Sequence, residues 1–336
     1  MQSEKFAEKD YIWVEINLLI LRCFPKPEPM KATVKFFLFL ALTATRALPA
    51  FSAGSPLQAD TLNPGIVISN LAPVVINGGE WEFNLFNTLS TLKLRDMNDP
   101  DGVARSSRLD QIGRVWYNPF QSNFINFGLE LRAAHQVLDA DETSGPFGVF
   151  NDEAIHSLGS IGLGARLKPV RTLPEFNIQT SLTFPVEGDA FTRQQLGFDR
   201  TAWTVQGVFY QQFQPWLYVF ATAGAVYQFR NEDRDQTSLT IPAGLYFVTV
   251  LKERKWYLIP SLSYASSLNY IKADSGFTRV RTSFLYGVSV QFLPADAWSI
   301  GLSLDRSIKE GPSNAPLRIV KGSYNQISLG VRYLLK

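Results

Sequence analysis

The sequence predicts an all-β protein, a single closed antiparallel transmembrane β-barrel of about twelve strands with short periplasmic turns and longer extracellular loops. Three observations predict it. From Trp81 to Lys336 the sequence contains runs in which apolar residues recur at nearly every second position, and the connections between these runs alternate in length. The composition is also poor in charged residues and rich in aromatic residues. Charged residues make up 18% and aromatic residues 13% of the chain, whereas a typical soluble domain has about 25% charged residues.

The overall charge excludes some classes of partner. The formal net charge is +2, with the pI near 8.5 and a mean hydropathy of −0.03. This balance has no basic stripe, so we expect no nucleic-acid partner. The chain has one cysteine, Cys23, and two histidines. We therefore expect no disulfide framework, no metal site and no cofactor.

The first 79 residues, which precede the predicted barrel, indicate an exported protein. Residues 1–29 are interpreted as an extension upstream of a mis-called start, the alternative being a genuine cytoplasmic or membrane-associated segment. Residues 30–52 predict a signal peptide, because two lysines precede an apolar stretch that ends in small residues. Cleavage is expected after Ser52, or after Gly54 as an alternative. Residues 53–79 are expected to form a periplasmic lead-in or a partial plug, and residues 80–336 the barrel.

Each strand is predicted from alternation of apolar and polar residues. From Phe176 to Phe184, for example, every second residue is apolar or Thr and the residues between them are Asn, Gln, Ser and Thr. Twelve such runs are found: 80–94, 107–117, 124–137, 157–168, 175–186, 200–213, 216–230, 237–251, 256–271, 278–292, 298–308 and 323–335. An even number is typical of closed bacterial barrels, whose closure leaves no unpaired backbone in the membrane.

The connections support this order of strands. Short ones at 118–123, 169–174, 214–215, 252–255 and 293–297 alternate with long ones at 95–106, 138–156, 187–199 and 309–322, while 231–236 and 272–277 are brief but polar. Short turns are expected at the periplasmic side. Pro242 and Pro260 lie inside predicted strands, where each removes a ladder hydrogen bond.

Aromatic residues near the strand ends predict girdles at the two membrane interfaces. These residues are Trp116, Tyr117, Trp216, Tyr227, Phe229, Trp256, Tyr270, Phe292 and Trp298.

The C-terminus resembles the signal by which outer-membrane proteins are recognised for barrel assembly. Ser328, Gly330, Tyr333 and Leu335 match its polar, glycine, aromatic and hydrophobic positions, although Leu335 and Lys336 replace the usual terminal aromatic residue. This resemblance implies outer-membrane localisation, with outer-membrane lipid, lipopolysaccharide and the barrel-assembly machinery as partners.

Two further segments are similar to outer-membrane proteins of the meta-pathway phenol-degradation type. They are Gly159-Ser-Ile-Gly-Leu-Gly-Ala-Arg-Leu167 and Ser181-Leu-Thr-Phe-Pro-Val-Glu-Gly188, within a stretch of about thirty residues. Members of that family are thought to transport small organic compounds, and the resemblance implies a solute of this kind.

A catalytic barrel is the first alternative to a channel. Outer-membrane phospholipase A is also a twelve-stranded barrel, in which a histidine activates a serine. His135, and His156 beside Ser157 with Ser160 nearby, are the candidates here, but the phospholipase signature His-x-Ser-Asn-Gly is absent. We predict no catalytic residues.

Two acidic clusters in the connections offer oxygen ligands. They comprise Asp139, Asp141 and Glu142 in one and Glu232, Asp233 and Asp235 in the other. Such groups suit calcium, but acidic loop residues are more often simply solvated, and no metal ligand is assigned.

The polar faces of the strands predict the residues that line the lumen. The charged ones are Asp110, Arg114, Glu130, Arg132, Arg166, Arg281, Asp305 and Arg332, and Gln179 is added as a polar neighbour. Five of the charged residues are positive and three negative, a surplus that favours anions in a narrow pore. In the alternative, these side chains pair with one another and fill a small barrel.

Three functions follow as hypotheses. The first is a channel or transporter for passive or selective diffusion of small solutes, anionic or organic. The second is a non-conducting barrel whose loops bind a partner, and the third is a lipid-acting enzyme. Fold alone does not decide among them.

Overall fold

The described part of the chain lies within one of two compact units. That unit is Leu62–Lys336. The computed structural model describes residues 75–96, 103–139, 146–150, 154–186, 190–230, 236–251, 255–271, 276–310, 317–319 and 324–336. The predicted extension (1–29), the signal peptide (30–52) and all but the last five residues of the lead-in (53–79) lie outside the described residues.

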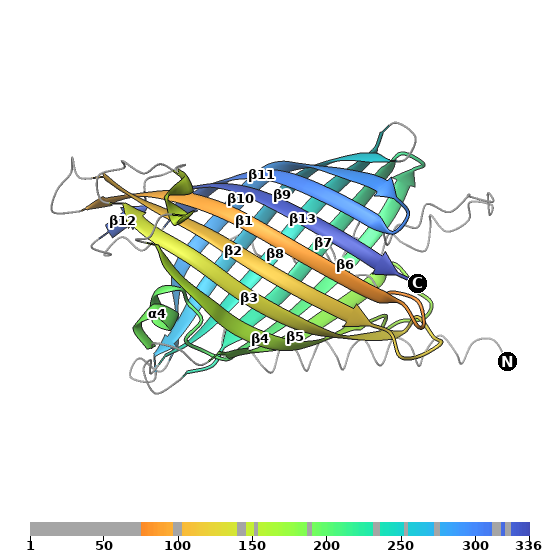
Figure 1. The fold of residues 1–336 in the computed structure, drawn as a ribbon, viewed down its shortest axis with the longest axis horizontal. Helices are drawn as coiled ribbons and strands as arrows, with labels where there is room; N and C mark the ends of the chain where they lie inside the picture. Colours follow the sequence, from red (N-terminus) through yellow and green to blue (C-terminus); the bar gives the residue numbers. More distant parts are fainter. Residues whose placement is uncertain are drawn as a thin grey trace, which may run out of the picture. The chain divides into compact units, whose positions relative to one another are not determined.

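In the described part of the chain, thirteen antiparallel strands form one sheet that closes on itself (Figure 1). The strands are β1 (Trp81–Asp96), β2 (Val103–Tyr117), β3 (Ile125–Asp139), β4 (Ile155–Leu167), β5 (Phe176–Pro185), β6 (Ala202–Gln214), β7 (Leu217–Gln228), β8 (Gln236–Val250), β9 (Trp256–Ile271), β10 (Gly276–Ala295), β11 (Trp298–Glu310), β12 (Leu317–Ile319) and β13 (Tyr324–Leu335). Closure comes from β1, which pairs with β2 on one side and β13 on the other. Twelve strands make the wall, as predicted, because the short β12 pairs only with the end of β1.

Every predicted run corresponds to one wall strand, and the ends differ by at most four residues. The largest difference lies where a strand continues into polar sequence. β2 begins at Val103, and Arg105, Ser106 and Ser107 are in register with β1 and β3. Backbone pairing prolongs a strand beyond its apolar stretch, so the alternating pattern marks only the part that crosses the apolar layer. The strand β12 was not predicted.

The two ends of the barrel differ. At the short-turn end, strands are joined by connections such as Pro215-Trp216 between β6 and β7 and Asp296-Ala297 between β10 and β11. The start of β1 and the C-terminus lie at this end (Figure 1). At the opposite, long-loop end lie the short helices η2 (Pro146–Phe150) and α4 (Ala190–Gln195).

Both prolines stay inside their strands, and each interrupts the ladder on one side only. The β7–β8 register has no pair between Ala223↔Ala243 and Val226↔Thr240, where Pro242 lies. The β8–β9 register likewise has none between Tyr246↔Ser261 and Thr249↔Leu258, beside Pro260. On their other sides Pro242 pairs with Ala265 and Pro260 with Val288. The wall thus loses hydrogen bonds locally where proline has no N–H, and its closure is kept.

The outer face is apolar, and aromatic residues gather on it at the short-turn end. Alternate residues of β3 and β4 are large and exposed, among them Leu129, Leu131 and Leu163. At the short-turn end Trp81 stacks on Tyr117 with ring centroids 4.3 Å apart, and Trp256 stacks on Phe292 at 4.4 Å. An apolar band ended by aromatic rings is typical of barrels that face lipid.

Trp116 is an exception to the predicted girdle, and the prediction was wrong for it. Its exposed fraction is 2%, and it pairs in register with Glu82 of β1 and Gly128 of β3, both on the inner face. Successive residues of a strand point to opposite faces, so Tyr117 is outward and Trp116 inward.

At the long-loop end a connection packs against the outside of the wall. Val149 of η2 is buried in a cluster with Leu109, Val137 and Ala154. Leu109 and Val137 have the outward parity of Leu131, so η2 covers the outer ends of β2 and β3.

Candidate functional site on the inner face of the barrel

A buried carboxylate joins two arginines at the short-turn end of the lumen. The Glu82 side chain is fully buried, and its Oε1 accepts a hydrogen bond from Arg166 Nη1 at 2.7 Å. Its Oε2 accepts bonds from Nε and Nη2 of Arg332 at 2.9 and 2.8 Å. Because Glu82 lies on β1, Arg166 on β4 and Arg332 on β13, the network crosses the inner face. A buried charge needs this degree of pairing to be tolerated.

The indole ring of Trp116 supports Arg166. The Arg166 guanidinium lies 4.0 Å from the ring centroid, a cation–π contact. Arg166 Nε also donates to Gln179 Oε1 at 3.2 Å. The ring lies against Gly128 and Gly164, where a β-carbon would overlap it; at Gly164 the distance would be 2.8 Å. These two glycines therefore let the ring lie flat on the wall beneath the arginine.

Substituting Gly128 tests this packing. The change Gly128→Val is expected to lower the free energy of unfolding by about 1–3 kcal/mol, because the indole must move and take Arg166 with it. Unfolding of the refolded mature chain in denaturant gives the difference. Gly113→Val is the matched control, since a β-carbon at Gly113 would meet nothing within 4 Å. Equal losses for the two variants would contradict the proposed packing.

A second buried carboxylate, further from the short-turn end, is also bound by two arginines. Glu130 of β3 accepts hydrogen bonds from Nε of Arg114 and Nε of Arg132. The carboxylate is buried, whereas the arginine side chains keep 22% and 30% of their surface exposed. Nearer the long-loop end, Arg108 binds Asp110 at 2.7 Å. Arginine and carboxylate thus alternate along the inner face of β2 and β3.

These strands carry a surplus of positive charge. Among the described side chains, the inner side of β1 to β4 and β13 holds five arginines at 108, 114, 132, 166 and 332, against three carboxylates at 82, 110 and 130. Asp305 of β11 reduces the surplus from two to one over the described inner face. Three of the arginines also stack on rings, namely Arg108 on Phe198, Arg114 on Phe86 and Arg166 on Trp116.

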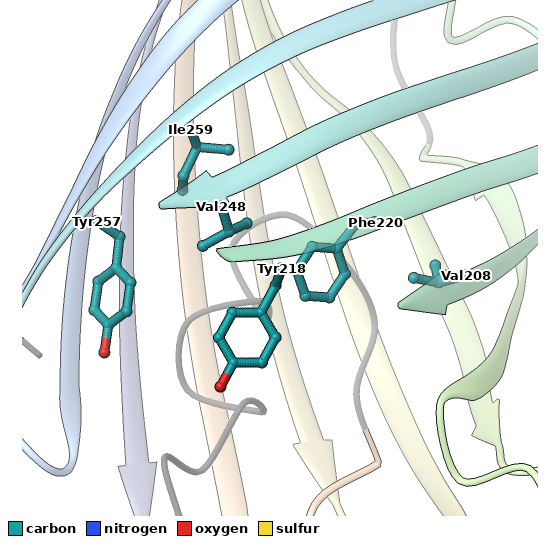
Figure 2. Packing of buried hydrophobic residues seen from close by; sticks show 6 residues of the cluster. All are labelled: Val208, Tyr218, Phe220, Val248, Tyr257 and Ile259. Carbon is teal, nitrogen blue, oxygen red and sulfur yellow. The ribbon is translucent and has the colours of Figure 1, made fainter. Parts of the chain in front are cut away.

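At the short-turn end of the barrel, the inner side of β6 to β9 is apolar. Val208, Tyr218, Phe220, Val248, Tyr257 and Ile259 form one buried cluster (Figure 2). Tyr210, Tyr246, Val250 and Leu293 pack against its edge and are partly buried. Among the described side chains on the inner face of β6 to β10, none is charged. The cluster was not predicted, because these residues belong to long apolar runs that alternation does not divide between faces.

The chain enters β1 along the short-turn end. Ile76 N–H donates to Asn126 Oδ1 at 2.7 Å, and Asn118 Nδ2 donates to Ile76 O at 2.8 Å. Ile76 packs with Trp116 and Leu334, both on the inner face. The last residues before β1 therefore lie against the inner side of the wall, next to the Arg166–Glu82–Arg332 network.

The predicted lumen residues lie as follows. Arg114, Glu130, Arg132, Arg166 and Arg332 are brought together with Gln179 in the two networks, while Asp110 lies further toward the long loops and Asp305 bonds Ser303 on β11. The Arg281 side chain is outside the described set, although its backbone pairs with Ser267.

Sequence reasoning missed Glu82, the center of the first network. Its signal was present, because Glu82 and Asn84 alternate with Trp81, Phe83 and Leu85.

The two histidines are not paired with a serine. His135 and His156 are in register and stack with ring centroids 5.9 Å apart. Both have the outward parity of Leu131, whereas Ser157 pairs with the inward Ala134. Neighbouring strand residues point to opposite faces, so His156 and Ser157 do not form a base and nucleophile pair.

Neither metal ligands nor helical membrane spans appear in the part of the chain that the structure describes. No group of three or more His, Cys, Asp or Glu is positioned there to hold a metal ion. No helix there is long and apolar enough to cross a membrane. Of the acidic clusters considered above, only the backbone of Asp139 falls within the described residues, as the last residue of β3.

The C-terminal positions that resemble an assembly signal all lie in β13. Leu335 pairs with Trp81, Tyr333 pairs with Phe83 and Trp298, and Ser328 accepts a hydrogen bond from Thr88 at 3.0 Å. The last strand thus forms the closing seam of the barrel with β1.

Comparisons with known proteins bear on the fold. No protein-family model and no curated protein sequence matches the chain. A solved outer-membrane channel of Pseudomonas putida F1, the COG4313 channel, is similar with a TM-score of 0.57 and 11% identity, over 79% of this chain and 100% of that one. The β domain of the Bordetella autotransporter BrkA has a TM-score of 0.46 and 12% identity, over 77% of this chain and 100% of that one. At these identities the first likeness shows that the chain has the fold of outer-membrane β-barrels.

Proposed function

We propose that the chain is an outer-membrane channel through which small solutes diffuse, with a preference for anions. The observation that carries this proposal is the contrast between the two faces of the closed barrel. The outer face is apolar with aromatic rings at the short-turn end, which suits lipid. The inner face holds paired charges and surplus arginine, which suits water and anions.

The first 79 residues fit this location. The signal peptide at 30–52 would deliver the chain across the inner membrane, and β13 would present Ser328, Gly330, Tyr333 and Leu335 to the assembly machinery. The short-turn end would then face the periplasm, with lipid and lipopolysaccharide around the wall. Residues 53–79 would act as a lead-in or partial plug, which the contacts of Ile76 with Asn118 and Asn126 support.

The resemblance to the phenol-degradation type proteins supports a small organic solute. Gly162 and Gly164, within its first segment, lie on the inner face of β4, and its second segment begins in the neighbouring β5. Ser160–Gly164 of the first segment pair antiparallel with Ser181–Pro185 of the second.

Single-channel recording tests the proposal. The refolded mature chain in a planar bilayer is expected to give discrete open steps, and the reversal potential under a potassium chloride gradient is expected to show chloride more permeant than potassium. Substituting the partly exposed Arg132→Gln should reduce this preference while the steps remain. Absence of steps over a wide voltage range would contradict the channel and favour a barrel that binds partners through its loops.

A further inference from the structure

The two sides of the lumen differ in chemistry, and they face each other. In the closed order of wall strands, five strands separate β2 from β8 in either direction. β2 carries Arg108, Asp110 and Arg114 on its inner face, and β8 carries Tyr246, Val248 and Val250. A solute in the lumen therefore has ionic groups on one side and apolar or aromatic groups on the other.

The two sides also lie at the same depth in the barrel. Arg114 lies close to the short-turn end of β2, which ends at Tyr117, and Tyr246 lies close to the same end of β8, which ends at Val250. Both side chains are partly exposed, as is Arg132. Tyr210 of β6, also partly buried, stacks on Phe220 with centroids 5.4 Å apart and extends the aromatic side.

The charged side has hydrogen-bond donors without a partner among the described residues. Arg114 and Arg132 each donate to Glu130 through Nε. Their terminal amino groups have no partner among the described residues. Deeper in the wall, Trp116 Nε1 and Arg332 Nη1 are buried donors without a hydrogen-bond partner in the described part of the chain, as are both side-chain polar atoms of Asn177 and the acceptor Asn84 Oδ1. The terminal amino groups of Arg114 and Arg132, in a region of surplus positive charge, suit an acceptor that carries negative charge.

We propose that the lumen binds small organic carboxylates with a ring-sized apolar body. Arg114 and Arg132 hold the carboxylate, and Tyr246 and Tyr210, at the edge of the buried aromatic cluster, contact the body. The planar guanidinium matches a carboxylate, and rings pack on rings in offset or edge-on geometry. This site rests on the proposed channel, because it assigns the class of solute that the lumen prefers.

Binding can be measured without conduction. In a ¹⁹F NMR titration of the refolded mature chain in detergent, 4-fluorobenzoate is expected to bind saturably. Competition should rank benzoate above both acetate, which has the charge alone, and benzyl alcohol, which has the ring alone. We expect benzoate to bind about tenfold more tightly than either acetate or benzyl alcohol, the size typical of one charge-assisted hydrogen bond or one buried ring.

Substitutions test the carboxylate-binding half and the ring-binding half of the site separately. Arg114→Gln and Arg132→Gln each leave Glu130 with one arginine, and each should weaken 4-fluorobenzoate about tenfold. Tyr246→Ser should weaken 4-fluorobenzoate several-fold and leave acetate unchanged. Arg171→Gln, in the exposed β4–β5 turn, is the control and should change nothing. Heat-shifted electrophoretic mobility shows whether each variant is folded, and Arg114→Lys replaces Arg114→Gln if the latter fails to fold.

The outcomes separate this site from the channel. Saturable binding with the expected ranking supports the site even if bilayers show no conductance, which would overturn only the channel. Conductance with no saturable binding, or with acetate bound as tightly as benzoate, overturns the site and leaves the channel standing. Binding that Arg171→Gln weakens as much as Arg114→Gln also overturns it, because the effect is then general to positive charge.

Discussion

Substituting Glu82→Gln is expected to lower the free energy of unfolding by about 3–5 kcal/mol, the size typical of breaking a buried ion pair from one side. Glu82 is the shared acceptor of Arg166 and Arg332, and all three side chains are almost wholly buried. A neutral amide leaves two buried guanidinium groups without a counter-charge. The loss is measured by denaturant unfolding of the refolded mature chain.

The control for this variant is an ion pair on the same inner wall with more exposure to solvent. In the Arg108–Asp110 pair the side chains keep 28% and 34% of their surface exposed. Asp110→Asn should therefore cost less than about 1 kcal/mol, as exposed pairs do. If Glu82→Gln costs no more than Asp110→Asn, water reaches the Glu82 network and it does not hold the wall together.

Substituting Leu131→Arg is expected to destabilise the barrel in lipid by about 2–4 kcal/mol, as an arginine facing the middle of a bilayer does. Leu131 lies halfway along β3, on the outer face, with 49% of its surface exposed. It pairs with Gly113 and Ile161, so no inner-face group neutralises the new charge. Reversible folding into phosphatidylcholine vesicles gives the energy.

Val170→Arg is the matched control, because Val170 is also an exposed apolar residue, 41% accessible, but lies in the β4–β5 turn. It should change the folding energy by less than about 0.5 kcal/mol, as surface substitutions usually do. Equal effects of the two changes would contradict a lipid-facing outer wall.

The fold was largely predictable because alternation is a local property. Each strand of a barrel has one face toward lipid and one toward the lumen, so a run such as Phe176–Pro185 carries its own signal. The ends of strands were less predictable, since pairing between backbones continues into polar residues such as Arg105 and Ser106 of β2. Pro242 and Pro260 argued against their strands in the sequence, but in the barrel each keeps its pairing on one side.

The sequence by itself determined which residues alternate, and therefore the closed barrel and most of the polar inner face, including Arg114, Glu130 and Arg166. Only the tertiary structure decided which of them meet. Glu82 and Arg332 are 250 positions apart and bond because β1 and β13 close the sheet. Trp116 faces inward because the register places it over Gly128 and Gly164. Closure and register depend on the whole sheet, so no local pattern reveals which distant side chains they bring into contact.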